Sequence, residues 1–186
     1  MERKTKGFQA IDLAYVAVCA ALMAVCSWIS IPATVPFTLQ TFAVFCSLGL
    51  LGGRRGTAAI LVYLLLGALG VPVFAGFSGG IGILFGTTGG YLLGFILMGL
   101  VYWLGERLSM DSRNIRIISM ILGLLLCYAF GTAWFMFVYA RQTGAIALGT
   151  ALAWCVVPFI LPDLAKLALA LMVGKRVRKA LHLPES

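Results

Sequence analysis

The chain has 186 residues, of which 62% are apolar and 11% are charged, and its formal net charge is +8. A soluble domain carries about 25% charged residues, so this composition excludes an ordinary soluble enzyme or binding domain. The apolar runs are continuous and of helix length, which excludes the alternating strands of a β-barrel. We therefore predict an all-α integral membrane protein in which residues 1–186 form a single domain.

Six membrane-spanning helices are predicted in chain order. They lie at roughly residues 11–31, 39–51, 57–73, 84–104, 115–139 and 149–173. About 20 residues, each rising about 1.5 Å, cross a hydrocarbon core of roughly 30 Å. The second and third segments are shorter than this, so we expect them to be tilted or incomplete. The first segment is interpreted as a retained span, because no cleavage site followed by a soluble domain is evident.

The first span carries small residues at helical spacing. Ala10, Ala14, Ala17 and Ala21 follow steps of four, three and four residues. Small residues at this spacing let two membrane helices pack closely. We predict that this face docks on a partner, although alanine is also frequent in membrane helices without such a role. Asp12 is interpreted as a helix-start residue, which the positive end of the helix dipole favours.

Two predicted external connections are rich in proline, glycine and threonine. They are residues 32–41 and residues 72–90, and the second reads PVFAGFSGGIGILFGTTGG. Non-helical backbone at membrane depth is tolerated only where it is buried in protein or lines a cavity. We therefore predict that the second connection folds back over the external end of the bundle and helps to wall a pocket. The alternative is an ordinary tight linker between two spans.

The last span contains two charged residues in an otherwise uncharged, largely apolar stretch. Asp163 and Lys166 lie within residues 151–173, where a central charge costs about 2.5–3.5 kcal/mol on insertion scales. Residues three apart share a helix face, so we expect the two side chains to meet. The pair is either part of a functional site or a structural polar contact between helices. Pro158 and Pro162 lie next to the charged pair on its N-terminal side and predict a bent helix beside a polar cavity, although such kinks also serve packing alone.

The basic residues are divided unevenly between the two predicted sides of the membrane. With a cytoplasmic N-terminus, twelve of the fourteen Lys and Arg residues lie on the cytoplasmic side, Arg141 lies outside and Lys166 lies within a span. This asymmetry is the one that the positive-inside rule describes. We therefore predict that both termini are cytoplasmic and that the net charge does not serve nucleic-acid binding. The twelve are Arg3, Lys4, Lys6, Arg54, Arg55, Arg107, Arg113, Arg116, Lys175, Arg176, Arg178 and Lys179.

Common enzyme and nucleotide-binding motifs are absent. The chain has no GxxxxGK[ST], HExxH or GxSxG motif, and its only histidine is His182 in the polar C-terminal tail. We therefore expect no bound nucleotide, metal or other cofactor, and we favour a non-enzymatic role. No inverted pair of broken segments is evident either, so the chain resembles a binding subunit that needs a partner. Five cysteines fit no metal or disulfide pattern and are assigned to packing: Cys19, Cys26, Cys46, Cys127 and Cys155.

Five motifs carry a more specific signal. They are PFTLQT at residues 36–41, GGRRG at 52–56, YLLLGALGVPVFAGFSGG at 63–80, GTTGGYLLGF at 86–95 and PDLAK at 162–166. In this order and at these separations they resemble the BioY family of biotin-binding S components of energy-coupling-factor (ECF) transporters. The resemblance covers nearly the whole chain. It implies a six-helix bundle in the bacterial plasma membrane, biotin as transported substrate, docking of the alanine face on a transmembrane coupling subunit, and two ATP-hydrolysing subunits as further partners.

The resemblance also implies which residues bind biotin. Asp163 is expected to accept from ureido N–H groups, and Lys166 to donate to the ureido carbonyl or to the carboxylate tail. The pair is neutral overall, so burying the ureido head adds no net charge whereas burying the carboxylate adds one; this favours the head inward. The remaining expected contacts are Ser78, Tyr91, Phe74, Phe77, Gln40 and Thr88, and the aromatic rings would either stack on the apolar body of biotin or belong to the core.

Two positions depart from the family pattern, and other functions remain open. Thr87 stands where proline is common, and Ser78 stands where some relatives have an asparagine. Serine is shorter than asparagine, so its ligand contact would be lost or bridged by water. The alternatives are an S component for another vitamin, a membrane-embedded enzyme that uses Asp163, and a structural assembly subunit. Transport by reorientation against partner subunits is implied by the resemblance alone.

Overall fold

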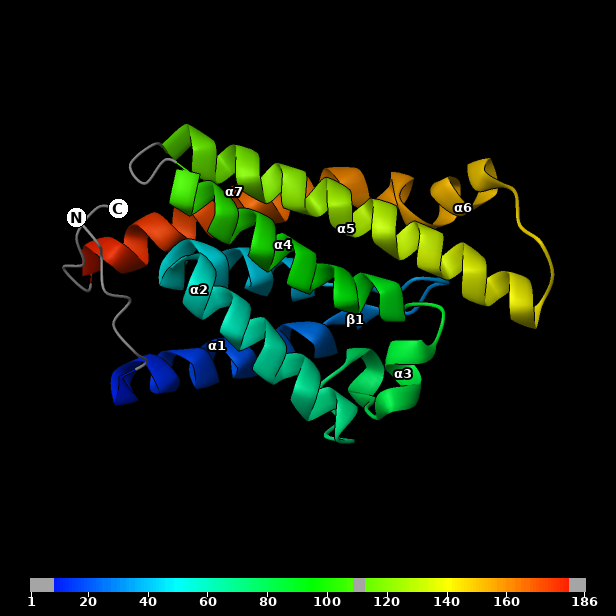
Figure 1. The fold of residues 1–186 in the computed structure, drawn as a ribbon, viewed down its shortest axis with the longest axis horizontal. Helices are drawn as coiled ribbons and strands as arrows, with labels where there is room; N and C mark the ends of the chain where they lie inside the picture. Colours follow the sequence, from blue (N-terminus) through cyan, green and yellow to red (C-terminus); the bar gives the residue numbers. More distant parts are fainter. Residues whose placement is uncertain (1–8, 109–112, 181–186) are drawn as a thin grey trace.

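The computed structural model describes residues 9–108 and 113–180, most of which are helical (Figure 1). The long helices lie side by side along one axis, so the predicted all-α membrane architecture is confirmed. The elements are α1 (Ala10–Trp28), β1 (Ser30–Ile31), β2 (Phe37–Thr38), α2 (Gln40–Ala68), a 3₁₀ turn (Ala75–Phe77), α3 (Ile81–Phe85), α4 (Gly89–Leu108), α5 (Arg113–Gln142), α6 (Leu148–Cys155) and α7 (Val157–Ala180).

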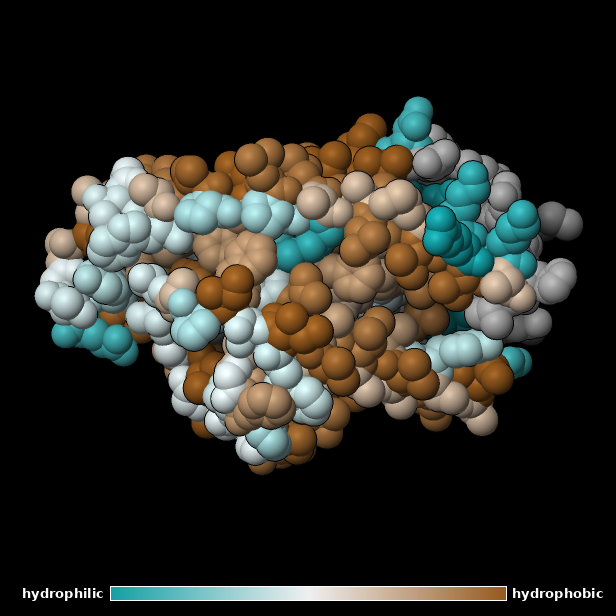
Figure 2. All heavy atoms as spheres, turned by 180° about the vertical axis from the view of Figure 1, so that it is seen from behind, coloured by the Kyte–Doolittle hydropathy of each residue, from teal (hydrophilic) through white to brown (hydrophobic). Residues whose placement is uncertain are grey.

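The outer surface of the bundle suits a bilayer. Within the described residues, five helical segments are long and apolar enough to cross a membrane. Large apolar side chains such as Val18, Leu65 and Leu161 are exposed on the outside of the helices. Figure 2 shows extensive apolar surface along this face of the molecule, with the largest group of strongly hydrophilic residues at the right-hand end and further polar surface at the opposite end. Water-soluble monomers rarely expose such large apolar patches. The exposed apolar side chains and the five long apolar helical segments therefore indicate a multi-pass membrane protein.

The helix labelled α2 contains a reversal at Gly52. This glycine has φ 79° and ψ 171°, which interrupts the helical backbone, and a positive φ is readily adopted only by glycine. A Cβ at Gly56 would lie 3.0 Å from the Cα of Leu48, although eight residues of straight helix extend about 12 Å. Residues 40–51 and 53–68 therefore pack against each other as a helical hairpin, which turns back near the left end of Figure 1. The predicted second and third spans correspond to these two halves.

Two predicted boundaries differ from the structure. The fourth span was expected to begin at residue 84, but α3 ends at Phe85 and α4 begins only at Gly89, because a glycine-rich turn separates two apolar stretches that are continuous in hydropathy. The last span is divided at Val156 (φ −125°, ψ −56°) between α6 and α7. Pro158, which cannot donate a backbone hydrogen bond, follows this break, so the predicted bend of the last span is present.

The polar end of α1 is tied to the hairpin. The backbone N–H of Gln9 donates to Oδ2 of Asp12 at 3.0 Å, as expected for a helix-start residue. Oδ1 of Asp12 also forms an ion pair with Arg55 at 2.8 Å, which the sequence did not indicate. The backbone N–H of Gly53 donates to Glu106 of α4 at 2.6 Å. In Figure 1, α1 begins and α7 ends at this same end of the bundle; Arg3, Lys4, Lys6 and His182 lie outside the described residues.

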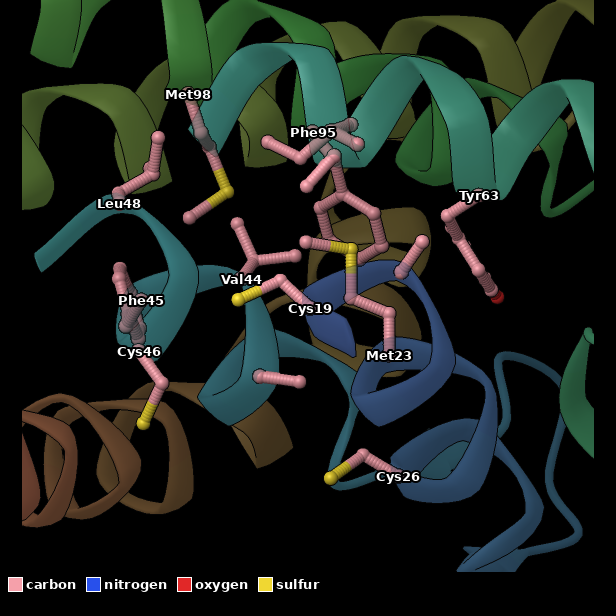
Figure 3. Close-up of a cluster of buried hydrophobic side chains, with 14 of the residues drawn as sticks. Cys19, Met23, Cys26, Val44, Phe45, Cys46, Leu48, Tyr63, Phe95 and Met98 are labelled. Atoms are coloured by element: carbon pink, nitrogen blue, oxygen red, sulfur yellow. The ribbon is translucent and has the colours of Figure 1, made fainter. Parts of the chain in front are cut away.

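The interior of the bundle is apolar and rich in sulfur. All five cysteines are free and buried. Figure 3 shows Cys19, Cys26 and Cys46 among the aliphatic and aromatic side chains that join α1 to α2 and α4. This is the packing role expected for them.

Candidate functional site

A cavity of about 290 Å³ lies inside the bundle, close to the lower end of the roughly 300–1,000 Å³ range of ligand pockets. Its walls come from the segment before α2, from α2 itself, from the glycine-rich connection, and from α4, α5, α6 and α7. Most of the lining is apolar or aromatic, with a few polar groups. The lining residues are Val35, Pro36, Thr38, Gln40, Thr41, Phe74, Ala75, Ser78, Ile83, Thr88, Tyr91, Leu92, Phe95, Leu124, Cys127, Tyr128, Cys155, Phe159, Asp163 and Lys166.

The two charged residues of the last span form an ion pair in the wall of this cavity. The ammonium Nζ of Lys166 lies 2.7 Å from Oδ1 of Asp163. Only 3% of Asp163 and 6% of Lys166 is exposed. Both residues lie on α7 three positions apart, which places them on one helix face as predicted. Both side chains are buried within the bundle, so the pair is not an exposed surface contact.

Two aromatic residues that the sequence did not single out complete this charged centre. The hydroxyl of Tyr128, near the middle of α5, donates to Oδ2 of Asp163 at 2.6 Å. The ammonium of Lys166 lies 4.3 Å from the centre of the Phe37 ring on β2, within the range of a cation–π contact. Phe37 also stacks on Phe159 of α7 with ring centres 5.7 Å apart. The pair is therefore held by α5, by α7 and by the segment before α2.

The glycine-rich connection forms one wall of the cavity, as predicted for residues 72–90. Phe74 and Ser78 form an antiparallel β-bridge, with the N–H of Phe74 donating to the carbonyl of Ser78 at 2.9 Å. The hydroxyl of Ser78 donates to the carbonyl of Ala75 at 2.7 Å, which leaves its oxygen free to accept a bond. The short helix α3 within this connection was not predicted, and Ile83 from it also lines the cavity.

Seven of the eight expected ligand-binding residues line the cavity, and Phe77 does not. Its side chain is 64% exposed, and its ring stacks on Trp28 at the end of α1 with centres 5.0 Å apart. Phe77 has φ 55°, unusual for a residue with a side chain. This backbone conformation turns its ring out of the bundle while Phe74, three residues earlier, points inward. Phe77 is therefore outside the lining of this cavity, and its expected contact with the ligand stays a prediction.

The two inward aromatic residues of the expected set differ in their surroundings. Phe74 is buried against Tyr63 of α2, edge to face at 5.5 Å, so its ring belongs to the core as well as to the cavity wall. Tyr91 of α4 lines the cavity and shares a hydrogen bond of 2.9 Å with Thr132 of α5. Both rings offer an apolar surface on which a compact ring system could stack.

The arrangement is suited to a small neutral polar head on an apolar body. Each oxygen of Asp163 receives one protein donor and keeps capacity for another, because a carboxylate accepts about four hydrogen bonds. Lys166 has three N–H groups, one of which is directed to Asp163. The site therefore offers acceptors and donors side by side within mainly apolar walls.

Comparison with known proteins gives the family. A family profile described as the BioY family matches residues 1–183. The chain is 44% identical over 160 residues to a protein named biotin transporter BioY from Thermotoga maritima, covering 86% of this chain and 90% of that one. The chain belongs to the BioY family. It is also 39% identical over 172 residues to biotin transporter BioY2 from Lactococcus lactis subsp. cremoris, with 91% of each chain covered.

A solved structure shares the fold. The crystal structure at 2.1 Å of the S-component for biotin from an ECF-type ABC transporter superimposes with a TM-score of 0.79 and 27% identity. The match covers 93% of this chain and 95% of that one. The BioY family is one of transport proteins, so the prediction of a non-enzymatic role is confirmed and the alternative of a membrane-embedded enzyme is discarded.

Proposed function

We propose that this protein is a high-affinity biotin-binding subunit that captures biotin outside the cell and delivers it across the bacterial plasma membrane together with an ATP-driven ECF module. The observation that carries the proposal is the buried ion pair of Asp163 and Lys166 in the cavity wall. Removing either residue of such a pair leaves an uncompensated charge in an apolar interior. A buried ion pair is therefore stable only when further hydrogen bonds satisfy both groups. Family membership supports biotin as the ligand, because the relatives are named biotin transporters.

The ureido head of biotin is expected to face the charged pair. A ureido group carries two N–H donors and one carbonyl acceptor, which matches the acceptor capacity of Asp163 and the donors of Lys166. Asp163 and Lys166 lie near the middle of the last apolar helical segment, Leu148–Val177, which spans α6 and most of α7. A carboxylate placed there would add a buried net charge, whereas the tail directed towards the cavity mouth stays near water.

The exposed face of α1 is proposed to dock on the coupling subunit. Ala10, Ala14, Ala17 and Ala21 are all exposed, while Val16 and other residues on the opposite side of α1 pack into the core. A small-residue face allows a partner helix to approach closely. The two ATP-hydrolysing subunits would then supply energy that this chain, with no phosphate-binding loop, cannot supply itself.

The protein is proposed to cross the membrane six times with both ends in the cytoplasm. The hairpin at Gly52 divides α2 into two crossings, which brings the five long helical segments to six crossings. Arg54 and Arg55 follow the hairpin turn, and α1 begins and α7 ends at the same end of the bundle (Figure 1). Basic residues at that end agree with the positive-inside rule.

Calorimetric titration of the purified protein with biotin, thiamine and riboflavin tests the ligand. We expect saturable one-site binding of biotin and no heat of binding with the other two vitamins. Binding of thiamine or riboflavin instead would identify an S component for another vitamin. Absence of binding to all three, from folded protein, would contradict a vitamin-capture function.

A further inference from the structure

A chain of buried hydrogen bonds runs behind the cavity from Thr38 to the start of the glycine-rich connection. The amide Nε2 of Gln40 donates to the hydroxyl of Tyr63, and that hydroxyl lies 3.1 Å from the carbonyl oxygen of Val73. The hydroxyl oxygen of Thr38 lies 3.4 Å from Oε1 of Gln40. All four residues are buried. Only Thr38 and Gln40 line the cavity, so Tyr63 lies one layer behind the ligand.

The structure gives a direction to each bond in this chain. The Val73 carbonyl can only accept, and in the structure it accepts from the hydroxyl of Tyr63 as well as from Ser27. The Tyr63 oxygen must then accept from Gln40, which requires the NH₂ group and not the carbonyl of the Gln40 amide to face Tyr63. At the other end, the hydroxyl of Thr38 accepts from the backbone N–H of Gln40 at 3.2 Å and donates to Oε1. In the structure the amide of Gln40 therefore has its NH₂ group towards Tyr63 and its carbonyl towards Thr38.

This orientation leaves Gln40 with defined binding capacity towards the cavity. One N–H of its NH₂ group is used by Tyr63, and the other is not committed to any hydrogen bond within the described residues. Its carbonyl oxygen keeps a second lone pair beside the bond from Thr38. An amide that could rotate freely would offer a ligand either group, whereas a fixed amide rejects a ligand that presents the wrong one.

We propose that Tyr63 is a positioning residue for ligand binding, which holds the Gln40 amide so that its free N–H donor is presented to the bound molecule. The inference rests on the proposed function, because it takes the molecule in this cavity to be biotin, which offers carbonyl and carboxylate oxygens as acceptors. Tyr63 itself touches no ligand in this account. It acts by removing the flipped state of Gln40, and this lowers the entropic cost of binding.

Ser27 provides a matched control. Its hydroxyl lies 2.5 Å from the same Val73 carbonyl and 2.7 Å from the carbonyl of Ala24; it also neighbours the Tyr63 hydroxyl, and within the described residues it forms no hydrogen bond to Gln40. Ser27 and Tyr63 are both fully buried. If the hydroxyl groups only anchor the glycine-rich connection through Val73, then Ser27→Ala and Tyr63→Phe should weaken biotin binding equally. If Tyr63 orients Gln40, only Tyr63→Phe should do so.

The test is calorimetric titration of the intact purified protein and its variants with biotin, together with the thermal midpoint of each ligand-free protein. Tyr63→Phe should raise the Kd about fivefold, the effect of about one net hydrogen bond. Ser27→Ala should stay within about twofold of the parent while losing similar thermal stability. Gln40→Met should raise the Kd at least as much as Tyr63→Phe, and adding Tyr63→Phe to it should cause no further loss, because the two act through one contact.

Each alternative result overturns a particular statement. Equal loss of affinity in Tyr63→Phe and Ser27→Ala, or additive losses in the Gln40→Met double variant, would reduce Tyr63 to an anchor of the connection. If Tyr63→Phe fails to fold, the Kd of the Gln40→Met variant still tests the inference. An unchanged Kd in that variant would contradict it. Absence of biotin binding by the parent protein would contradict the proposed function and this inference with it, whereas failure of the variants alone would contradict only the inference.

Discussion

The hydroxyl of Tyr128 on α5 donates to Oδ2 of Asp163 on α7 at 2.6 Å, while Oδ1 of the same carboxylate receives Lys166 at 2.7 Å. The carboxylate is therefore fixed from two sides by groups on two different helices. The lone pairs of Asp163 that remain free to accept hydrogen bonds are therefore oriented before a ligand binds. Such pre-organisation reduces the ordering cost that a ligand must overcome.

Removing the hydroxyl of Tyr128 should weaken biotin binding without unfolding the protein. Hydrogen bonds to charged groups contribute about 1.5–3 kcal/mol, so Tyr128→Phe is expected to raise the Kd at least about tenfold. Tyr139→Phe is the control, because Tyr139 packs on Phe135 and Trp154 and does not line the cavity. The Kd of each variant is measured by calorimetry. Equal affinities for the Tyr128→Phe variant and the parent would show that this hydrogen bond does not prepare the site.

The ring of Phe37 should support binding through the ammonium of Lys166, which lies 4.3 Å from the ring centre. A desolvated cation–π contact contributes up to about 2 kcal/mol. We expect Phe37→Leu to raise the Kd for biotin by about tenfold or more, while Phe37→Tyr stays close to the parent. If Phe37→Leu binds as tightly as Phe37→Tyr, the aromatic ring has no role at Lys166.

The methyl ester of biotin tests the orientation of the ligand. With the ureido head at Asp163 and Lys166 and the carboxylate near water, esterification removes no buried charge contact. The ester should bind within about tenfold of biotin, or roughly 1.4 kcal/mol. A competition titration against biotin measures the ratio. A far larger loss would place the carboxylate on Lys166 and reverse the proposed orientation.

The alanine face of α1 should be needed for assembly and not for ligand binding. Ala17→Trp places a large ring on the exposed side of α1, away from the cavity, and prevents close helix approach. We expect this variant to bind biotin like the parent and to fail to co-purify with the coupling subunit. Leu61→Trp on the exposed side of α2 is the control for adding a bulky ring elsewhere. Normal assembly of the Ala17→Trp variant would exclude this face as the docking surface.

The spans were predictable because hydropathy and glycine placement act locally along the chain. The predicted break between residues 51 and 57 contains Gly52, whose positive φ reverses the helix. The start of α4 was misplaced, since residues 81–85 are as apolar as a span and only the three-dimensional turn at residues 86–88 separates them from it. Hydropathy therefore locates the apolar segments better than it gives their ends.

The charged centre of the site could be predicted, and its supporting residues could not. Asp163 and Lys166 stand out because charges in an apolar span are costly wherever the helix packs. Tyr128 and Phe37 are ordinary residues of their segments, and their roles arise only when α5 and the residues before α2 pack against α7. That Phe77 lies outside the cavity lining could not be predicted either, because the direction of its ring depends on its own positive φ in the glycine-rich connection.

The central claim is that the ion pair in the last span binds biotin. Its most direct test is calorimetric titration of Lys166→Ala with biotin, beside the parent protein and a Lys175→Ala control on the exposed end of α7. Removing one partner of a buried pair typically costs about 3–5 kcal/mol, so Lys166→Ala should insert into the membrane and lose high-affinity binding while Lys175→Ala keeps it. Tight binding retained by Lys166→Ala would show instead that Asp163 and Lys166 form only a structural contact between helices.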